Sequence, residues 1–406
     1  MISTEKESEN RKLSSDEGLF SSIRERIAGG ELGLLPVILA LIVIWIAFQM
    51  LNPHFLEPRN LSNLVQQIVV IGTLAIGVTF VLLLGEIDLS IAAVSGVSAG
   101  ILVILATVWT GPVGALAAIG IAILAGVVIG LFQGFWVTMI GVPAFIVTLA
   151  GSLGYQGILL ALLGDTGTVP VINPTLLAIS DTYLPGWLGW IVGLATVAIY
   201  AGINLRARKR RTSKGLPVRP FNQLILSLSG IVAVTVAVVG VLNLYKGIPL
   251  SALILIVLVF VFGWITQSTV FGRHIYALGG NTEAARRAGI QVKSVKISVF
   301  ILASGLAAIG GIMGASRLGA ASPATGTGDL LLLSIAAAII GGTSLFGGRG
   351  SVYNALAGAL VLGSVENGMD LLSAPSSTKY LVEGSILLIA VTIDTLTRRR
   401  RIRAGR

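Results

Sequence analysis

Residues 62–84 read SNLVQQIVVIGTLAIGVTFVLLL, which is 23 consecutive residues without a charged side chain. A helix that crosses the hydrocarbon core of a bilayer needs about 20 mostly apolar residues. The run is continuously apolar over most of its length, whereas the strands of membrane barrels alternate apolar and polar residues. The segment therefore predicts a transmembrane helix.

The same pattern recurs along the whole chain. Of its 406 residues, 54% are hydrophobic and only 11% are charged, whereas soluble domains carry roughly 25% charged residues. In lipid, a helix satisfies its own backbone hydrogen bonds. The sequence thus predicts an all-α polytopic membrane protein with about twelve transmembrane helices. The apolar runs lie at about 34–51, 62–84, 88–108, 113–138, 143–163, 187–205, 221–243, 249–267, 295–317, 327–343, 350–372 and 378–395.

The distribution of basic residues predicts the orientation. With the N-terminus in the cytoplasm, only four basic residues fall outside, namely Arg59, Lys246, Arg317 and Lys379. Lys and Arg concentrate in the cytoplasmic loops of membrane proteins, and an even number of spans returns the C-terminus to the same side. We therefore expect an N-in, C-in topology. The net charge of +10 is interpreted as topological, and no nucleic-acid partner is expected.

This orientation divides the chain into a membrane domain and its cytoplasmic parts. The divisions are a polar N-terminal tail at 1–33, a membrane domain at 34–395 with cytoplasmic loops at 206–220 and 268–294, and a basic tail at 396–406. Two of the runs, 88–108 and 327–343, are flanked by glycines, so each either crosses fully or is a broken helix.

Glycines inside the runs recur every four residues, as at Gly126, Gly130 and Gly134, at Gly96 and Gly100, and at Gly310 and Gly314. Small residues at this spacing allow helices to pack closely in lipid, and lining of a pore is the alternative. The stretches that begin at Gly85 and at Gly341 are weakly alike. Transporters are often built from two related halves, so an internal repeat is a hypothesis that this similarity raises.

The residue content limits the chemistry of the chain. It has no cysteine and two histidines, His54 and His274, in connecting segments, so neither a thiolate site nor a multi-histidine metal centre is expected. A phosphate-binding Gly-x4-Gly-Lys-Ser/Thr loop does not occur in the sequence. We expect no enzyme activity and no cofactor bound by this chain.

The loop at 272–296 contains a short helix flanked by breakers. Glu283 to Ala288 favours a helix, Asn281 or Thr282 can cap its N-terminus, and Gly289 can end it in a left-handed conformation. Read from the residues alone, this is either a docking element or a basic topogenic loop with an incidental helix.

Here the sequence resembles the permease subunits of ABC importers. Glu283, Ala284, Ala285 and Gly289 match their cytoplasmic coupling motif, although the Ile-x-Leu-Pro that follows in its older form is absent. The sugar-permease branch has a similar loop without that ending. The residues that the resemblance assigns to docking of an ATPase are Gly279, Asn281, Glu283, Ala284, Ala285, Arg286, Arg287, Gly289 and Ile290.

Three more stretches resemble this branch, at 85–90, 142–149 and 341–350. The similarity extends from about residue 60 to 395. Most relatives have nearer ten spans, and the two extra spans around the basic loop, together with the context at 151–157, resemble the xylose permeases among the ribose, xylose, galactose and arabinose permeases.

The resemblance implies a function and a set of partners. The chain would carry a monosaccharide, xylose or a related pentose or hexose, across the bacterial plasma membrane as a multi-pass protein. The implied partners are a cytoplasmic ABC ATPase that holds ATP and Mg²⁺, a periplasmic or lipid-anchored sugar-binding protein, a second permease copy in a homodimer, and the lipid bilayer.

Polar residues at the ends of two runs are candidates for the translocation path or for a structural motif. They are Glu86, Asp88, Ser90, Thr343 and Ser344. Asp88 can cap a helix that starts at Leu89, or line the path. Glu366, in the eleventh run, either reaches water toward the outer end or relays protons.

The alternative function is a twelve-span, ion-coupled secondary transporter. That class needs paired ionisable residues near the middle of the membrane, and the sequence offers few.

Overall fold

The computed structural model describes residues 35–164, 167–216, 218, 221–327 and 329–403, and the predicted N-terminal tail at 1–33 lies outside them. The described chain is predominantly helical. Its helices are α2 (Leu35–Leu51), α3 (Pro58–Leu83), α4 (Ile91–Val108), α5 (Gly111–Phe135) with a π-helical turn η1 (Trp136–Ile140), α6 (Ala144–Leu163), α7 (Pro174–Asp181), α8 (Gly186–Thr212), α9 (Phe221–Asn243), α10 (Leu250–Ser268), α11 (Val270–Gly280), α12 (Thr282–Arg287), α13 (Val292–Leu318), α14 (Asp329–Ile340), α15 (Val352–Leu371) and α16 (Ser376–Arg403).

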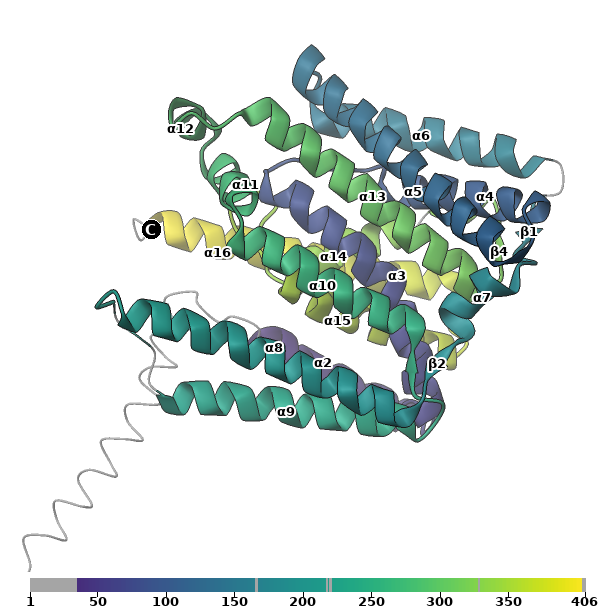
Figure 1. Ribbon diagram of the computed structural model, residues 1–406, viewed down its shortest axis with the longest axis horizontal. Coiled ribbons are helices and arrows are strands. Elements are labelled where there is room, and N and C mark those ends of the chain that lie inside the picture. Colours follow the sequence, from purple (N-terminus) through teal and green to yellow (C-terminus); the bar gives the residue numbers. More distant parts are fainter. Residues whose placement is uncertain (1–34, 165–166, 217, 219–220, 328, 404–406) are drawn as a thin grey trace, which may run out of the picture.

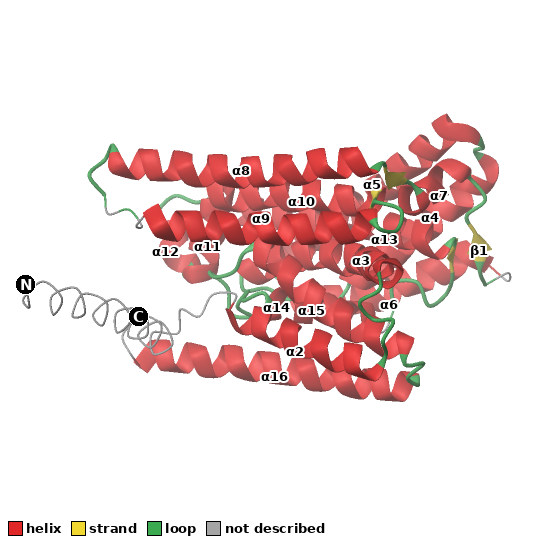
Figure 2. Ribbon diagram, turned by 90° about the horizontal axis from the view of Figure 1, so that it is seen from below, coloured by secondary structure: helices red, strands yellow, loops and turns green. Residues whose placement is uncertain are grey.

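The long helices lie roughly parallel in one bundle (Figures 1 and 2). The short helix α12, the turn between α8 and α9, and the end of α16 lie at one end, which we call the α12 end. Helix α7 and the two-residue strand β1 (Val169–Pro170) lie at the other, the α7 end. All of the long basic segments of the described chain therefore share one end.

Two short antiparallel pairings join distant loops. Strand β1 pairs with β4 (Ala320–Ala321), and β2 (Tyr183–Leu184) pairs with β3 (Ile248–Pro249). Both flank α7, whose Ser180 amide donates to the hydroxyl of Ser316 in α13 at 3.1 Å. These contacts hold the α7 end together.

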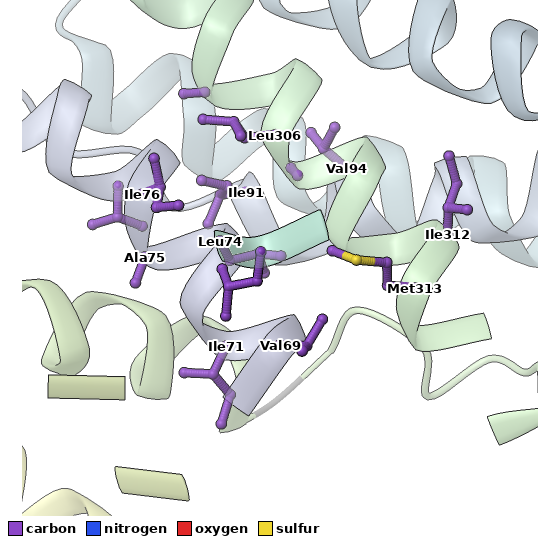
Figure 3. Close-up of a cluster of buried hydrophobic side chains, with 14 of the residues drawn as sticks. Val69, Ile71, Leu74, Ala75, Ile76, Ile91, Val94, Leu306, Ile312 and Met313 are labelled. Atoms are coloured by element: carbon purple, nitrogen blue, oxygen red, sulfur yellow. The ribbon is translucent and has the colours of Figure 1, made fainter. Parts of the chain in front are cut away.

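Helix α3 is the central element. Of its most apolar window 83% is buried, against 11% in α8 and 6% in α9, so α8 and α9 form a lipid-facing pair at the edge. Figure 3 shows α3 side chains such as Leu74 and Ile76 packed with Ile91 of α4 and Leu306 of α13. The runs predicted at 187–205 and 221–243 form this peripheral hairpin.

The glycine periodicity of α5 serves close packing on α13. A Cβ atom at Gly126 would lie 2.7 Å from the carbonyl oxygen of Ser304, and one at Gly130 would overlap that of Phe300. Because lipid supplies no hydrophobic drive between helices, close van der Waals contact of this kind holds them together. The packing interpretation of these glycines is confirmed.

The twelve predicted runs each coincide with a helix, but two need correction. Helix α4 begins at Ile91 rather than at 88, because residues 84–90 form an irregular turn. Helix α14 has 12 residues, about 18 Å at 1.5 Å per residue, which is short of a hydrocarbon core of about 30 Å. The run 327–343 is therefore a broken helix.

Helix α14 is short because the loop before it enters the bundle. A Cβ at Gly326 would overlap the carbonyl oxygen of Ala92 and lie 2.6 Å from the amide nitrogen of Gly96 in α4. With a φ of +73°, this position favours glycine. The loop therefore descends beside α4, and α14 begins inside the bundle.

Candidate functional site

Helix α12 forms as its sequence predicts. The side-chain oxygen of Asn281 accepts a hydrogen bond from the amide of Ala284 at 2.9 Å, which is the N-cap interaction. Gly289 has a φ of +84° and follows the end of the helix in the left-handed conformation. Both ends are fixed locally, so the helix is a defined element in a long connection.

One face of α12 is exposed and charged. Glu283 contacts Arg286 at 2.9 Å and Arg287 at 3.2 Å, and hydrogen bonds from these two side chains lower the pKa of the Glu283 carboxyl. Ala285 is buried on the opposite face. The three charged side chains thus form an exposed ridge, while the alanine anchors the helix to the protein.

The helix before α12 ends in a tight contact with two distant turns. We define the glycine junction as residues 83–85, 279–280 and 346–348. The amide of Gly348 donates to the carbonyl oxygen of Leu83 at 2.9 Å, which joins the α14–α15 turn to the end of α3. The hydroxyl of Tyr276 also donates to the carbonyl oxygen of Gly350 at 2.9 Å.

Gly279 fills the centre of the glycine junction. A Cβ atom at this position would overlap the carbonyl oxygen of Leu83 and lie 2.5 Å from the amide nitrogen of Gly348. Gly85 and Gly347 have φ values of +77° and +83°, which favour glycine. The contact is therefore made by main chain on all three segments.

The turn from Glu86 to Ser90 is tied to three helices. Glu86 forms an ion pair with Lys296 of α13, each side chain being about one-fifth exposed. The hydroxyl of Ser90 accepts from Gln133 of α5 at 2.6 Å, and the hydroxyl of Thr148 in α6 accepts from the amide of Leu89 at 3.0 Å. The turn is thus held from all sides.

Asp88 bonds within this turn. Its Oδ1 atom accepts from the amide and the hydroxyl of Ser90 at 2.8 and 2.7 Å, while Oδ2 has no hydrogen-bond partner among the residues that the structure describes. The prediction that Asp88 caps a helix starting at Leu89 is corrected, because the helix begins two residues later with Ser90 as its N-cap residue.

Thr343 and Ser344 lie in the second turn. Thr343 is buried, and a Cβ at Gly350 would lie 2.7 Å from its hydroxyl oxygen. The amide of Ser344 donates to the carbonyl oxygen of Arg349 at 2.9 Å, and its hydroxyl accepts from the amide of Phe346 at 3.3 Å. Both residues shape the turn that carries Gly347 and Gly348.

The structure therefore unites predictions made for separate stretches. The end of α11, next to the loop for which docking is predicted, and the two polar turns meet at the glycine junction. Sequence reasoning missed the partnership of Lys296 with Glu86 and the central place of Gly279. The only local signal was the concentration of glycines at 279–280 and 347–348, which does not reveal that the segments touch.

A bundle of helices long and apolar enough to cross a bilayer defines a polytopic membrane protein. The chain belongs to the family described as branched-chain amino acid transport system / permease component, whose model matches residues 60–391. It is a multi-pass protein of the bacterial inner membrane.

Curated relatives are sugar permeases. The chain is 40% identical to the xylose transport system permease protein XylH of Escherichia coli strain K12, over 85% of this chain and 87% of that protein. It is 33% identical to the ribose import permease protein RbsC of Bacillus subtilis, over 88% and 91% of the two chains. It is 31% identical to the L-arabinose ABC transporter permease protein AraH of Azospirillum brasilense, over 90% and 88%. No solved structure shows a significant match to the chain.

Proposed function

We propose that the chain is the membrane subunit of an ATP-binding-cassette importer that carries xylose or a related pentose or hexose. The observation that carries the proposal is the exposed ridge of α12, joined through the glycine junction to the turns α3–α4 and α14–α15. The names of the relatives, which include a xylose transport system and an L-arabinose ABC transporter, support the substrate class.

The α12 end faces the cytoplasm in this proposal. The basic segments that follow α8 and α10 and the C-terminal arginines are concentrated at this end of the bundle, as expected for cytoplasmic segments. Twelve helices that alternate in direction, α14 included, return both ends of the chain to this side. The topology is then N-in, C-in with ten spans plus the α8–α9 hairpin.

Other chains complete the importer. A cytoplasmic ATPase holds ATP and Mg²⁺ and contacts the α12 ridge, and a sugar-binding protein in the periplasm or anchored to lipid delivers its ligand at the α7 end. A second copy of the permease pairs with the first in a homodimer. The permease itself contributes a path and a mechanical connection, and performs no covalent chemistry.

The glycine junction supplies the mechanical connection. When the ATPase displaces α12, α11 moves with it because the two helices are separated only by Asn281. Gly279 then presses on Leu83 and Gly348, whose turns lead into α4 and α15. Main-chain atoms in close contact cannot give way by a change of rotamer, as side chains can. The α3–α4 and α14–α15 turns therefore move together.

The test is co-purification of the permease with its ATPase after substitution of the ridge. Glu283→Lys reverses the central charge of the ridge, and Gly289→Pro removes the left-handed residue after α12. Both variants are expected to lose ATPase association while still inserting in the membrane.

The matched control is Glu57→Lys. Glu57 is 52% exposed and contacts His54, much as Glu283 is 51% exposed and contacts arginines, but it precedes α3 at the α7 end. It should leave association unchanged. Unaltered association in both ridge variants, or sugar uptake by the permease alone under an ion gradient, would contradict the proposal in favour of the secondary transporter.

A further inference from the structure

A cavity of about 170 Å³ lies among α3, α13, α14 and α15, toward the α7 end. Its polar wall comes from Gln67, Ser95, Arg317, Thr325, Asp329 and Glu366. Apolar side chains such as Val70 and Ile71 complete it. None of the candidate path residues at 86–90 or 343–344 is part of this wall, so the cavity is separate from the glycine junction.

Gln67 presents an unsatisfied acceptor in this wall. The residue is only 5% exposed, and its Oε1 atom has no hydrogen-bond partner, while its Nε2 atom donates to Asp370 at 3.1 Å. A buried amide oxygen without a partner costs free energy. Gln67 lines the cavity, but its Oε1 atom is itself buried, so rotation of the side-chain amide toward the cavity would let a ligand hydroxyl supply the missing hydrogen.

Arg317 and Glu366 supply complementary groups. Within the described part of the chain, neither side chain has a hydrogen bond or an ion-pair contact, and their charges act on each other and on Asp370 at longer range. A guanidinium group has five N–H donors and a carboxylate only acceptors. Together with the Gln67 oxygen, the wall therefore offers unused donors and acceptors that converge on one volume.

The discontinuous helix α14 opens on the same cavity. Its first residue, Asp329, and the preceding loop residues Thr325 and Thr327 belong to the wall. The N-terminal end of a helix broken inside the membrane is a place where transporters contact their substrates. Gly310, Gly311 and Gly314 line the side formed by α13 and leave its main chain close to the space.

The mixture of groups favours a neutral, hydroxyl-rich ligand over an ion. Among the described residues, no group of three or more His, Cys, Asp or Glu side chains could hold a metal ion. A free anion would face Asp329 and Glu366, and a free cation would face Arg317. Hydroxyl groups both donate and accept, so each wall group can be satisfied at once by a polyol.

We propose that this cavity is a monosaccharide-binding site within one permease copy, in which Gln67, Arg317 and Glu366 bind sugar hydroxyls. The assignment rests on the proposed function for its substrate class. The sugar would occupy this site after it leaves the sugar-binding protein. The site lies toward the α7 end of the bundle, opposite the end that contacts the ATPase.

The absence of cysteine from the chain allows a direct test. Thr327→Cys places one thiol in the cavity wall of the full-length chain, and its reaction with a maleimide is followed in proteoliposomes. D-Xylose is expected to slow the labelling several-fold, while sucrose, as an osmotic control, has no effect. Addition of Gln67→Leu should remove the protection.

The control thiol is Thr107→Cys. Thr107 is exposed at the C-terminal end of α4 and is not part of the cavity wall, so D-xylose should leave its labelling unchanged. Equal protection of both thiols, protection by sucrose, or no protection at Thr327→Cys would overturn the assignment.

A second measurement compares neighbouring glutamines in the assembled importer. Gln67→Leu should lower the sugar transported per ATP hydrolysed about tenfold, the effect of one lost hydrogen bond. Gln66→Leu removes an amide that bonds to Tyr183 at 2.9 Å outside the cavity and should preserve the ratio. Equal ratios for the two variants would overturn the assignment. Protection of Thr327→Cys in an importer that does not transport sugar would contradict the proposed function and support the binding site.

Discussion

The two ends of the bundle differ in how tightly they are packed. At the α12 end, the glycine junction brings three segments into main-chain contact with no room for a Cβ atom at Gly279. At the α7 end, the same helix bundle surrounds a cavity lined by Gln67, Arg317 and Glu366, and the Oε1 atom of Gln67 has no hydrogen-bond partner among the described residues. A close-packed contact is suited to transmitting displacement, and a polar-lined cavity is suited to holding a ligand. In the two proposals made above, coupling and binding are therefore separated along the bundle axis.

The largest expected effect tests the close packing of the junction. Gly279→Ala should destabilise the protein by about 3 kcal/mol or more, because the added methyl overlaps the carbonyl oxygen of Leu83. Gly280→Ala is the matched control, since a Cβ there meets nothing within 4 Å, and should change stability by less than about 0.5 kcal/mol. The thermal midpoint of each purified variant in detergent is the measurement. Equal midpoints would show that the junction is loosely packed.

A smaller effect is expected at the ion pair beside the junction. Glu86→Gln should cost about 1–3 kcal/mol, because Lys296 then keeps a largely buried charge without its partner. A double-mutant cycle with Lys296→Gln measures the coupling, and the double variant should be less destabilised than the sum of the single ones. Additive effects would mean that the pair does not hold the turn to α13.

The smallest expected effect on stability tests the packing of α13 beside the cavity. Gly314 lies inside helix α13, and a Cβ there would be 3.8 Å from Val70, so Gly314→Ala should stabilise the protein by up to about 1 kcal/mol through helix propensity. Gly310→Ala, one turn earlier, would overlap Leu74 and should destabilise it. Thermal midpoints distinguish the two. Destabilisation by Gly314→Ala would show that the cavity wall is tightly packed at Gly314 as well as at Gly310.

Local features could be predicted from the sequence. The cap at Asn281 and the left-handed Gly289 depend on residues within a few positions, and the apolar runs that locate the helices depend on composition. The start of α4 was placed incorrectly because Asp88 can bond to any nearby free amide, and only the packing of the turn against Gln133 and Thr148 selects Ser90.

The long-range features could not be predicted. Nothing in the apolar run 327–343 reveals that the helix begins only at Asp329, after a loop whose Gly326 packs against α4. Three different helices contribute Gln67, Arg317 and Glu366. In the sequence, each of these polar residues is also compatible with an ordinary structural role, such as reaching water near a helix end. For Glu366 the sequence left two roles open, reaching water or relaying protons, and the structure adds its place in the cavity wall. Their convergence depends on how the helices are arranged.

The main-chain character of the glycine junction also limits how this protein can diverge. In an ordinary core, a larger residue on one side is tolerated when a smaller one replaces its neighbour. Here Gly279 faces the carbonyl of Leu83 and the amide of Gly348, which are present whatever the neighbouring side chains are. No second substitution can make room for a larger side chain at position 279. We therefore expect this position to remain glycine as the sequence diverges.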